Sequence, residues 1–401
     1  MWVLIKHEFK RFFKNKFIML LLISMVLINL GSGIAMKSYS VNNDFYDETK
    51  IHSDFLEEYS PIVEDFKDEI NNNVELSDID QLTYTKANFL SEYHSKAIYC
   101  ILKKDNAALL ENELNYGDFV LKDFFDHMGD SSYESIVQKE KVDVEKLQLN
   151  TFLYRYMYEN NIKLPFRAEY YPSGLNLTLF LLKNVYVLLL PIIIIFLSAS
   201  AICGELDNNT FKLLFTQPIS KFKILLSKML VSLSLGFIFL LVVLISSLII
   251  GTILTEFGDV NYPVAIFNNT SMAAVDKYQA INFASISNLG RVLLQIIGYL
   301  SLIIPFITLL SVFVSSVCKN KISSNTILLI GTIILYLFSN NLPLGREFNP
   351  VTYINTYNVI TGTYTLTHPT VSISLGIIIM ISIALLSTIF SILKCKKLTL
   401  D

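Results

Sequence analysis

Charge is the property that this sequence has least of. Only 17% of its 401 residues are Asp, Glu, Lys or Arg, and 52% are hydrophobic, whereas a soluble domain carries about 25% charged residues. Cysteine is also scarce, with four residues in the whole chain. This composition excludes a soluble enzyme, a disordered chain and a small secreted domain held together by disulfides.

The sequence also lacks the short motifs of common catalytic and nucleotide-binding sites. It contains no G-x-x-x-x-G-K-[ST] phosphate loop, no H-E-x-x-H and no Cys-x-x-Cys pair. Asp123, Asp126 and His127 lie close together, but such a group is usually a solvated helix face. We therefore expect that this chain is not an enzyme, has no catalytic residues, holds no metal or other cofactor, and binds no nucleic acid.

What the sequence has instead is long stretches without charge. Six of them hold at least 20 uncharged residues each, and the longest, between Glu347 and Lys394, holds 46. An α-helix needs about 20 apolar residues to cross a hydrocarbon layer of roughly 30 Å. The sequence therefore predicts six transmembrane helices, at residues 17–36, 178–203, 224–255, 291–317, 322–340 and 371–393.

The segment between the first two predicted spans differs from the rest of the chain. Residues 37–177 carry 27 acidic and 14 basic side chains, whereas the remaining residues carry 8 and 18. Apolar residues recur there at intervals of three and four, as in Ile51, Phe55 and Tyr59, which is typical of amphipathic helices. We predict an all-α membrane protein with a large helical extracellular domain inserted between spans one and two.

The basic residues predict the orientation of the chain, because Lys and Arg of short loops stay in the cytoplasm. They precede the first span, follow the sixth, and lie between spans two and three and between spans four and five. All four groups fall on one side when both termini are cytoplasmic. Residues 37–177, 256–290 and 341–370 are then extracellular, and residues 394–401 form a cytoplasmic tail.

The first 16 residues predict an amphipathic helix that lies in the inner membrane interface, where basic residues attract anionic headgroups. The alternative is a simple positive flank that fixes the orientation of the first span, and both are compatible. The residues expected at the membrane interface are Trp2, Phe9, Arg11, Phe12 and Phe13.

The predicted spans contain no Asp or Glu between their ends. Carriers driven by proton or sodium gradients usually place an ionisable group or a broken helix near the middle of the membrane, so we expect the driving force to come from elsewhere. Milder polar residues remain as candidates for a translocation path, namely Asn29, Gln295, Tyr299 and Asn340.

Residues 204–223, between spans two and three, carry the most information. The segment begins with Glu205 and Asp207, continues with a short amphipathic stretch, and is interrupted by Pro218, which cannot continue a helix. Ser220 is placed to cap the helix that follows, and Lys221 opens that helix. Such a segment suits mechanical contact with a soluble partner, although a plain topogenic loop would have the same charges.

On these residues the sequence resembles the permease subunits of ABC transporters of the ABC-2 family. That family shows an acidic residue, a Gly-Thr step, a Lys-Leu-Leu stretch, a Thr-x-Pro-Ile-Ser-basic turn and a Leu-x-x-Lys run. The counterparts here are Glu205, Thr210, Lys212–Leu214, Thr216–Lys221 and Leu225–Lys228. The chain departs from the pattern at Asn209, where Gly is common, and at Asp207, where Glu is frequent. The resemblance covers about 260 residues and leaves out 37–177.

The resemblance implies that residues 204–223 form a coupling helix that docks on a separate ATP-binding subunit. That subunit would hold ATP and Mg, and a second permease, either a copy of this chain or a related one, would complete the transporter. The residues expected to couple are Glu205, Asp207, Thr210, Phe211, Lys212, Leu213, Leu214, Gln217, Pro218, Ser220 and Lys221.

The resemblance also favours export or extraction from the membrane over import. The apolar spans and acidic extracellular domain favour an amphipathic or peptide-like substrate, as in export of or immunity to antimicrobial peptides. The excess of Lys over Arg, 27 to 5, favours a bacterial plasma membrane. Two other functions stay open: a membrane receptor or sensor that binds its ligand with residues 37–177, and a secondary carrier.

Overall fold

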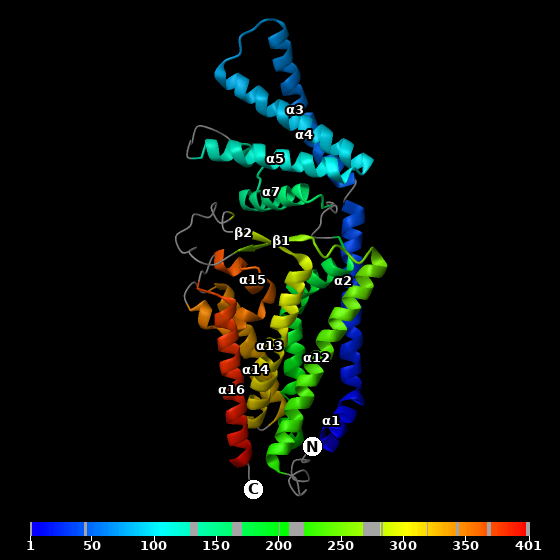
Figure 1. Ribbon diagram of the computed structural model, residues 1–401, viewed down its shortest axis with the longest axis vertical. Coiled ribbons are helices and arrows are strands. Elements are labelled where there is room, and N and C mark those ends of the chain that lie inside the picture. The colour runs from blue at the N-terminus through cyan, green and yellow to red at the C-terminus, as the bar shows by residue number, and fades with distance from the viewer. Residues whose placement is uncertain are drawn as a thin grey trace.

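The computed structural model describes residues 2–43, 46–128, 135–162, 171–199, 201–207, 220–267, 281, 284–318, 320–341, 345–366 and 370–397. Six of its helices are long and apolar enough to cross a membrane, which confirms the number of spans expected from the sequence. The molecule is elongated, with these helices side by side in one half and the other helices stacked across the other half (Figure 1). Both termini lie at the free end of the long helices, which we call the termini end.

The bundle is built from five continuous helices and one composite helix. The continuous ones are α2 (Lys16–Asn43), α12 (Lys221–Leu254), α13 (Leu289–Val317), α14 (Lys321–Asn341) and α16 (Ile373–Lys397). The composite one consists of α8 (Gly174–Phe180), the π-helical turn η1 (Leu181–Val185) and α9 (Tyr186–Ser198). Two shorter helices accompany the bundle at the termini end, α1 (Trp2–Phe13) and α10 (Cys203–Asp207).

Apolar side chains of α9, α12 and α13 form the core of the bundle. Leu190, Ile194, Phe239 and Ile304 are each at most 1% exposed. Gly236 of α12 lets α13 approach closely, because a Cβ atom there would lie 2.6 Å from the Ile304 side chain. The outward faces of the long helices remain apolar and exposed, as expected of helices that contact lipid.

A second hydrophobic core lies in the half of the molecule opposite the termini. Five helices build it, and we call them the distal domain: α3 (Tyr46–Asn71), α4 (Asp78–Lys103), α5 (Asn106–Asp126), α6 (Ile136–Lys139) and α7 (Val144–Glu159). Tyr59, Leu90 and Val120 are buried at its centre. Side chains of Ser77, Asp105 and other polar residues accept hydrogen bonds from first-turn N–H groups, so the sequence fixes where these helices begin.

A short hairpin lies between the distal domain and the bundle. Strands β1 (Pro263–Phe267) and β2 (Ala284–Asn288) are antiparallel, with Val264 opposite Ser287. Four short helical segments lie at the same end of the bundle: η4 (Arg346–Phe348), η5 (Pro350–Ile354), α15 (Thr356–Ile360) and η6 (Thr363–Leu366). This hairpin corrects the expectation of an all-α protein; two five-residue strands are too short to show a clear period of two in the sequence.

Candidate functional site

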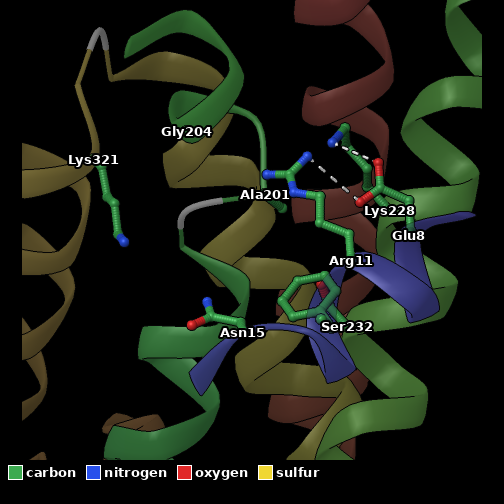
Figure 2. A pocket seen from close by; sticks show the side chains of 9 residues that line it. Glu8, Arg11, Asn15, Ala201, Gly204, Lys228, Ser232 and Lys321 are labelled. Atoms are coloured by element: carbon green, nitrogen blue, oxygen red, sulfur yellow. Dashed lines mark hydrogen bonds and ion pairs between the residues drawn. The ribbon is translucent and has the colours of Figure 1, made fainter. Parts of the chain in front are cut away.

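A buried carboxylate at the termini end joins three separate elements. Glu205, in α10, accepts a hydrogen bond from the Arg11 guanidinium of α1. The same oxygen, Glu205 Oε1, also accepts from Lys228 Nζ of α12 at 3.2 Å. Lys228 Nζ in turn lies 3.1 Å from Oε1 of Glu8 in α1. We call these four residues the charge cluster, and Figure 2 shows three of them, Glu8, Arg11 and Lys228, from close by.

The burial of the charge cluster decides its energetic importance. The side chains of Glu205 and Lys228 are only 4% and 6% exposed, and that of Glu8 is 12% exposed, whereas Arg11 is about half exposed. Removing a charge from water is unfavourable by several kcal/mol unless an opposite charge and hydrogen bonds compensate. The two acidic and two basic side chains balance one another, so separating α1, α10 and α12 would leave a buried charge unpaired.

The segment that carries Glu205 also contacts α13 and α14. The backbone N–H groups of Ile202 and Cys203 both donate to Ser315 Oγ, near the end of α13, at 3.1 Å. Asp207 Oδ2 accepts from the backbone N–H of Lys321, the first residue of α14, at 2.7 Å. A carboxylate at a helix start satisfies an N–H that has no partner within the helix and complements the helix dipole. Residues 202–207 therefore contact α1, α12, α13 and α14.

A small polar cavity borders the charge cluster. It measures about 220 Å³ and opens between α1, the end of span two, α12 and α14 (Figure 2). Its lining consists of Glu8, Arg11, Phe12, Asn15, Ala201, Gly204, Lys228, Ser232 and Lys321. Protein interiors are otherwise close-packed and resist displacement, so this space gives the segment around Glu205 room to shift relative to α1.

The structure describes only part of the predicted coupling set. Glu205 and Asp207 make the contacts given above, and Lys221 opens α12 as expected. Ser220 occupies the N-cap position of α12 as expected, but its side chain makes no capping hydrogen bond there. The residues between them, Thr210, Phe211, Lys212, Leu213, Leu214, Gln217 and Pro218, lie outside the described residues.

The predicted interfacial residues of α1 have different environments. Phe9 and Phe12 pack against the bundle core, and Arg11 belongs to the charge cluster. Trp2 and Phe13 are exposed, Trp2 to 77%. Exposed apolar rings beside a bundle of spans are available for lipid contact, and that contact stays a prediction.

The predicted path residues occupy different environments. Asn29 of α2 is fully buried, where it donates to Ser246 Oγ of α12 and accepts from the Tyr186 hydroxyl of α9, both at 2.7 Å. Tyr299 is buried and Gln295 is exposed, while the side chain of Asn340 lies outside the described part of the chain. The structure therefore shows Asn29 holding three helices together, and a translocation path through these residues stays a prediction.

The partners of Glu205 could not be identified from the sequence. Arg11 was expected to face lipid, and Glu8 and Lys228 were given no role as a pair. Each carried a weak signal: Glu8 is the lone acidic residue of a basic helix, and Lys228 is the last charge before 27 uncharged residues. A charge next to so long an apolar run is expected to find an opposite charge.

One protein-family model matches nearly the whole chain. The sequence model of the ABC-2 family transporter proteins matches residues 2–394. This chain belongs to the ABC-2 family. The match spans the distal domain as well, which the resemblance in the coupling segment had left out. Neither the curated proteins nor the solved structures contain a match.

Membership of the ABC-2 family makes the chain a multi-pass membrane protein of an ABC transporter. It also implies association with an ABC ATP-binding subunit, because that subunit supplies the nucleotide chemistry that the phosphate-loop motif carries. The ABC-2 protein described here has no such motif in its sequence.

Proposed function

We propose that this ABC-2 protein is the permease subunit of an ATP-driven exporter and that residues 204–223 transmit movement from the ATP-binding subunit. The observation that carries the proposal is the charge cluster. Glu205 lies at the start of the coupling segment and is held by Arg11 of α1 and Lys228 of α12. Any displacement of the segment therefore acts on α1 and α12 together.

The mechanism follows from the stiffness of these contacts. Asp207 and the N–H groups of residues 202–203 attach the same segment to the ends of α14 and α13. A partner that pushes residues 204–223 would move four helices at once, because breaking any of the buried contacts leaves a polar group without a partner. The cavity beside Arg11 gives the first movement room.

The rest of the assembly follows the same reasoning. Both termini and the coupling segment lie on the cytoplasmic side of a bacterial plasma membrane. Helix α1 lies in the interface between that membrane and the cytoplasm. The distal domain, with most of the acidic residues, is extracellular. A second permease, of this or a related sequence, completes the pathway, and ATP and Mg bind to the partner subunit. The cargo is amphipathic or peptide-like and moves outward or is extracted from the membrane.

The test is co-expression with a cognate ATP-binding subunit. The purified chain alone should hydrolyse no ATP, and the complex should copurify and hydrolyse it. Reversing the charges with Glu205→Lys and Asp207→Lys should weaken copurification and uncouple turnover. The matched control is Glu64→Lys with Asp65→Lys, two exposed acidic residues of α3. Glu205 is buried, so reversing its charge also destabilises the fold. Lys212→Glu therefore provides a second variant within the coupling segment.

Intact assembly and coupled turnover in both segment variants would contradict the proposal. Transport in vesicles that runs on a proton or sodium gradient without nucleotide would instead identify a secondary carrier.

The distal domain favours one second candidate, a membrane receptor or sensor, because it has a hydrophobic core of its own. Deleting residues 46–162 while keeping the spans separates the two functions. Loss of ligand response with preserved ATP-driven transport would favour the sensor.

A further inference from the structure

A large cleft separates the distal domain from the bundle. It measures about 790 Å³, within the roughly 300–1,000 Å³ typical of ligand pockets. The start of α5 and the end of α7 form one wall, and the segment before α8, residues 256–262 and the end of β2 form the other. In Figure 1 the first wall belongs to the α5–α7 layer, and the second lies beside the hairpin beneath that layer. Interfaces between domains are a frequent place for binding sites.

The lining is unusually rich in side-chain amides. Six asparagines line the cleft, drawn from both walls: Asn106, Asn160, Asn161, Asn176, Asn261 and Asn288. One pair is linked across the lower wall, where Asn288 Nδ2 donates to Asn261 Oδ1 at 3.2 Å. Asn160 Nδ2 also donates to the backbone carbonyl oxygen of Tyr156 at 2.8 Å. Each amide offers two donors and an acceptor oxygen with two lone pairs, so it can make several hydrogen bonds at once. A peptide backbone, with one donor and one acceptor per residue, complements such a surface.

The charge of the cleft selects among ligands. Glu256 and Asp259 are both exposed and line it, and among the described lining residues there is no Lys or Arg. The backbone N–H of Asn261 donates to Asp259 Oδ1 at 2.8 Å, which orients that carboxylate. Residues 37–177 add a large excess of acidic over basic side chains. A concave surface with one sign of charge concentrates counter-ions, so the cleft favours cations and disfavours phosphate or carboxylate ligands.

Aromatic and apolar side chains complete the lining and argue for more than a small cation. Tyr156, Tyr171 and Tyr262 line the cleft together with Ile162. Tyr262 and Ile162 also pack on Leu110 and Met157, the apolar cluster that attaches the distal domain to the hairpin. Tyrosine faces bind Lys and Arg by cation–π contacts and bind apolar side chains by burial. The combination fits a chain that carries backbone, cationic and apolar groups.

We propose that this cleft is a binding site for a cationic peptide segment, held by the Glu256 and Asp259 carboxylates at its charged side chains and by the asparagine amides at its backbone. That the bound peptide is also the transported cargo rests on the proposed function, whereas binding itself does not.

The experiment measures binding of a fluorescein-labelled Lys/Leu octapeptide to the full chain in nanodiscs of neutral lipid, without any ATP-binding subunit. Fluorescence anisotropy should show saturable binding that weakens as salt increases. Glu256→Gln with Asp259→Asn should weaken binding about tenfold or more, because both attractive charges are lost while the side-chain shapes remain. Asn160→Lys, an exposed residue at the end of α7, should weaken it as well by adding a repulsive charge.

The matched control is Glu64→Gln with Asp65→Asn, which removes the same charge from an exposed part of α3 away from the cleft and should leave affinity within about twofold of the wild type. Equal binding by the cleft double variant and the wild type would overturn the proposal. Equal binding of a Glu/Leu octapeptide would overturn it as well, as would binding of a neutral oligosaccharide in place of the cationic peptide.

The two proposals fail separately. A chain that assembles with its ATP-binding subunit but does not bind the cationic peptide disproves only the cleft site. A chain that binds the peptide through Glu256 and Asp259 but forms no such complex disproves only the permease function.

Discussion

The two ends of this molecule hold their charged residues in different ways. At the termini end, Glu205 and Lys228 are 4% and 6% exposed and depend on each other. In the distal domain, the ion pair between Arg155 and Asp118 is about half exposed on both sides. Water and salt screen an exposed pair, whereas a buried pair that loses one partner leaves a charge in a poorly polarisable surrounding. Charge therefore fixes helix positions at the termini end, whereas the exposed Arg155–Asp118 pair contributes little to the distal domain. A less exposed pair in that domain, Lys86 with Asp123 at 3.1 Å, joins α4 to α5.

The distal domain also relies on aromatic packing and on hydrogen bonds from tyrosine hydroxyls to a carboxylate. The His94 ring stacks on Phe55 with centroids 4.8 Å apart, and its Nδ1 lies 2.8 Å from Nδ1 of His52. Tyr59 and Tyr116 hydroxyls both donate to the Glu140 carboxylate. We therefore expect that displacing α1, α10 or α12 destabilises the termini end, whereas lowering the pH destabilises the distal domain.

The largest effect is expected from removing the central charge of the cluster. Glu205→Gln keeps the shape of the side chain but leaves Lys228 with Glu8 as its remaining acidic partner and Arg11 without its buried one. The bundle should lose about 3 kcal/mol of unfolding free energy. Thermal unfolding in nanodiscs measures this loss.

The comparison supplies the control. Asp118→Asn breaks the exposed pair with Arg155 and should change the unfolding free energy by less than about 1 kcal/mol. Adding Lys228→Met to Glu205→Gln should restore part of the lost stability, because the buried positive charge is gone. Equal unfolding temperatures for Glu205→Gln and Asp118→Asn would remove the distinction between the two ends.

The second effect is a pH dependence of the distal domain. Burial lowers the pKa of His52 to about 4, and burial together with the neighbouring His52 lowers the pKa of His94 to about 3. Both rings are neutral when folded but gain protons near pH 6.5 when unfolded. Their stabilising contribution is therefore complete above about pH 6.5 and is lost as the pH falls toward 4, by on the order of 2–4 kcal/mol at pH 5.

Hydrogen exchange of α3 and α4 measures this loss, with the bundle helices as an internal reference. His94→Phe, which keeps an aromatic ring against Phe55, should reduce the pH dependence. Equal protection of α3 and α4 at pH 7 and pH 5 would show that the histidine pair does not control the distal domain.

The smallest effect concerns the distal end of the bundle itself. Gly251 of α12 packs directly on the start of α8, where an added Cβ would lie 2.6 Å from Gly174 Cα. The atoms that this Cβ would meet, in Gly174 and Ser173, belong to the backbone and cannot rotate away. Gly251→Ala should therefore separate α12 from α8 and lower the unfolding free energy by about 2 kcal/mol. Gly31→Ala in α2, where a Cβ meets nothing within 4 Å, should be neutral or slightly stabilising. Similar unfolding temperatures for both variants would contradict the close contact.

Much of the architecture could be predicted from the sequence because its causes are local. A charge-free run of sufficient length forms a span wherever it occurs, and six runs gave six helices. The helical character of residues 37–177 was likewise visible in the spacing of residues such as Ile51, Phe55 and Tyr59. The β1–β2 hairpin was not, because its strands are short and pair across 16 intervening residues.

The candidate site was predicted only in part, because only some of its features depend on neighbouring residues in the sequence. Glu205 and Asp207 were identified by their place in a recognisable segment. The partner of Glu205 was not, because Arg11 lies 194 positions away and nothing in a local pattern reports such a contact.

The sequence by itself determined the number of spans, the helical distal domain, and the segment that carries the family resemblance, since burial of apolar surface and helix periodicity are properties of consecutive residues. Only the tertiary structure decided which charges neutralise one another at Glu205 and which amides and carboxylates face one cleft. Those arrangements depend on distances between segments far apart in the chain, and electrostatic and hydrogen-bond energies depend on distance in space.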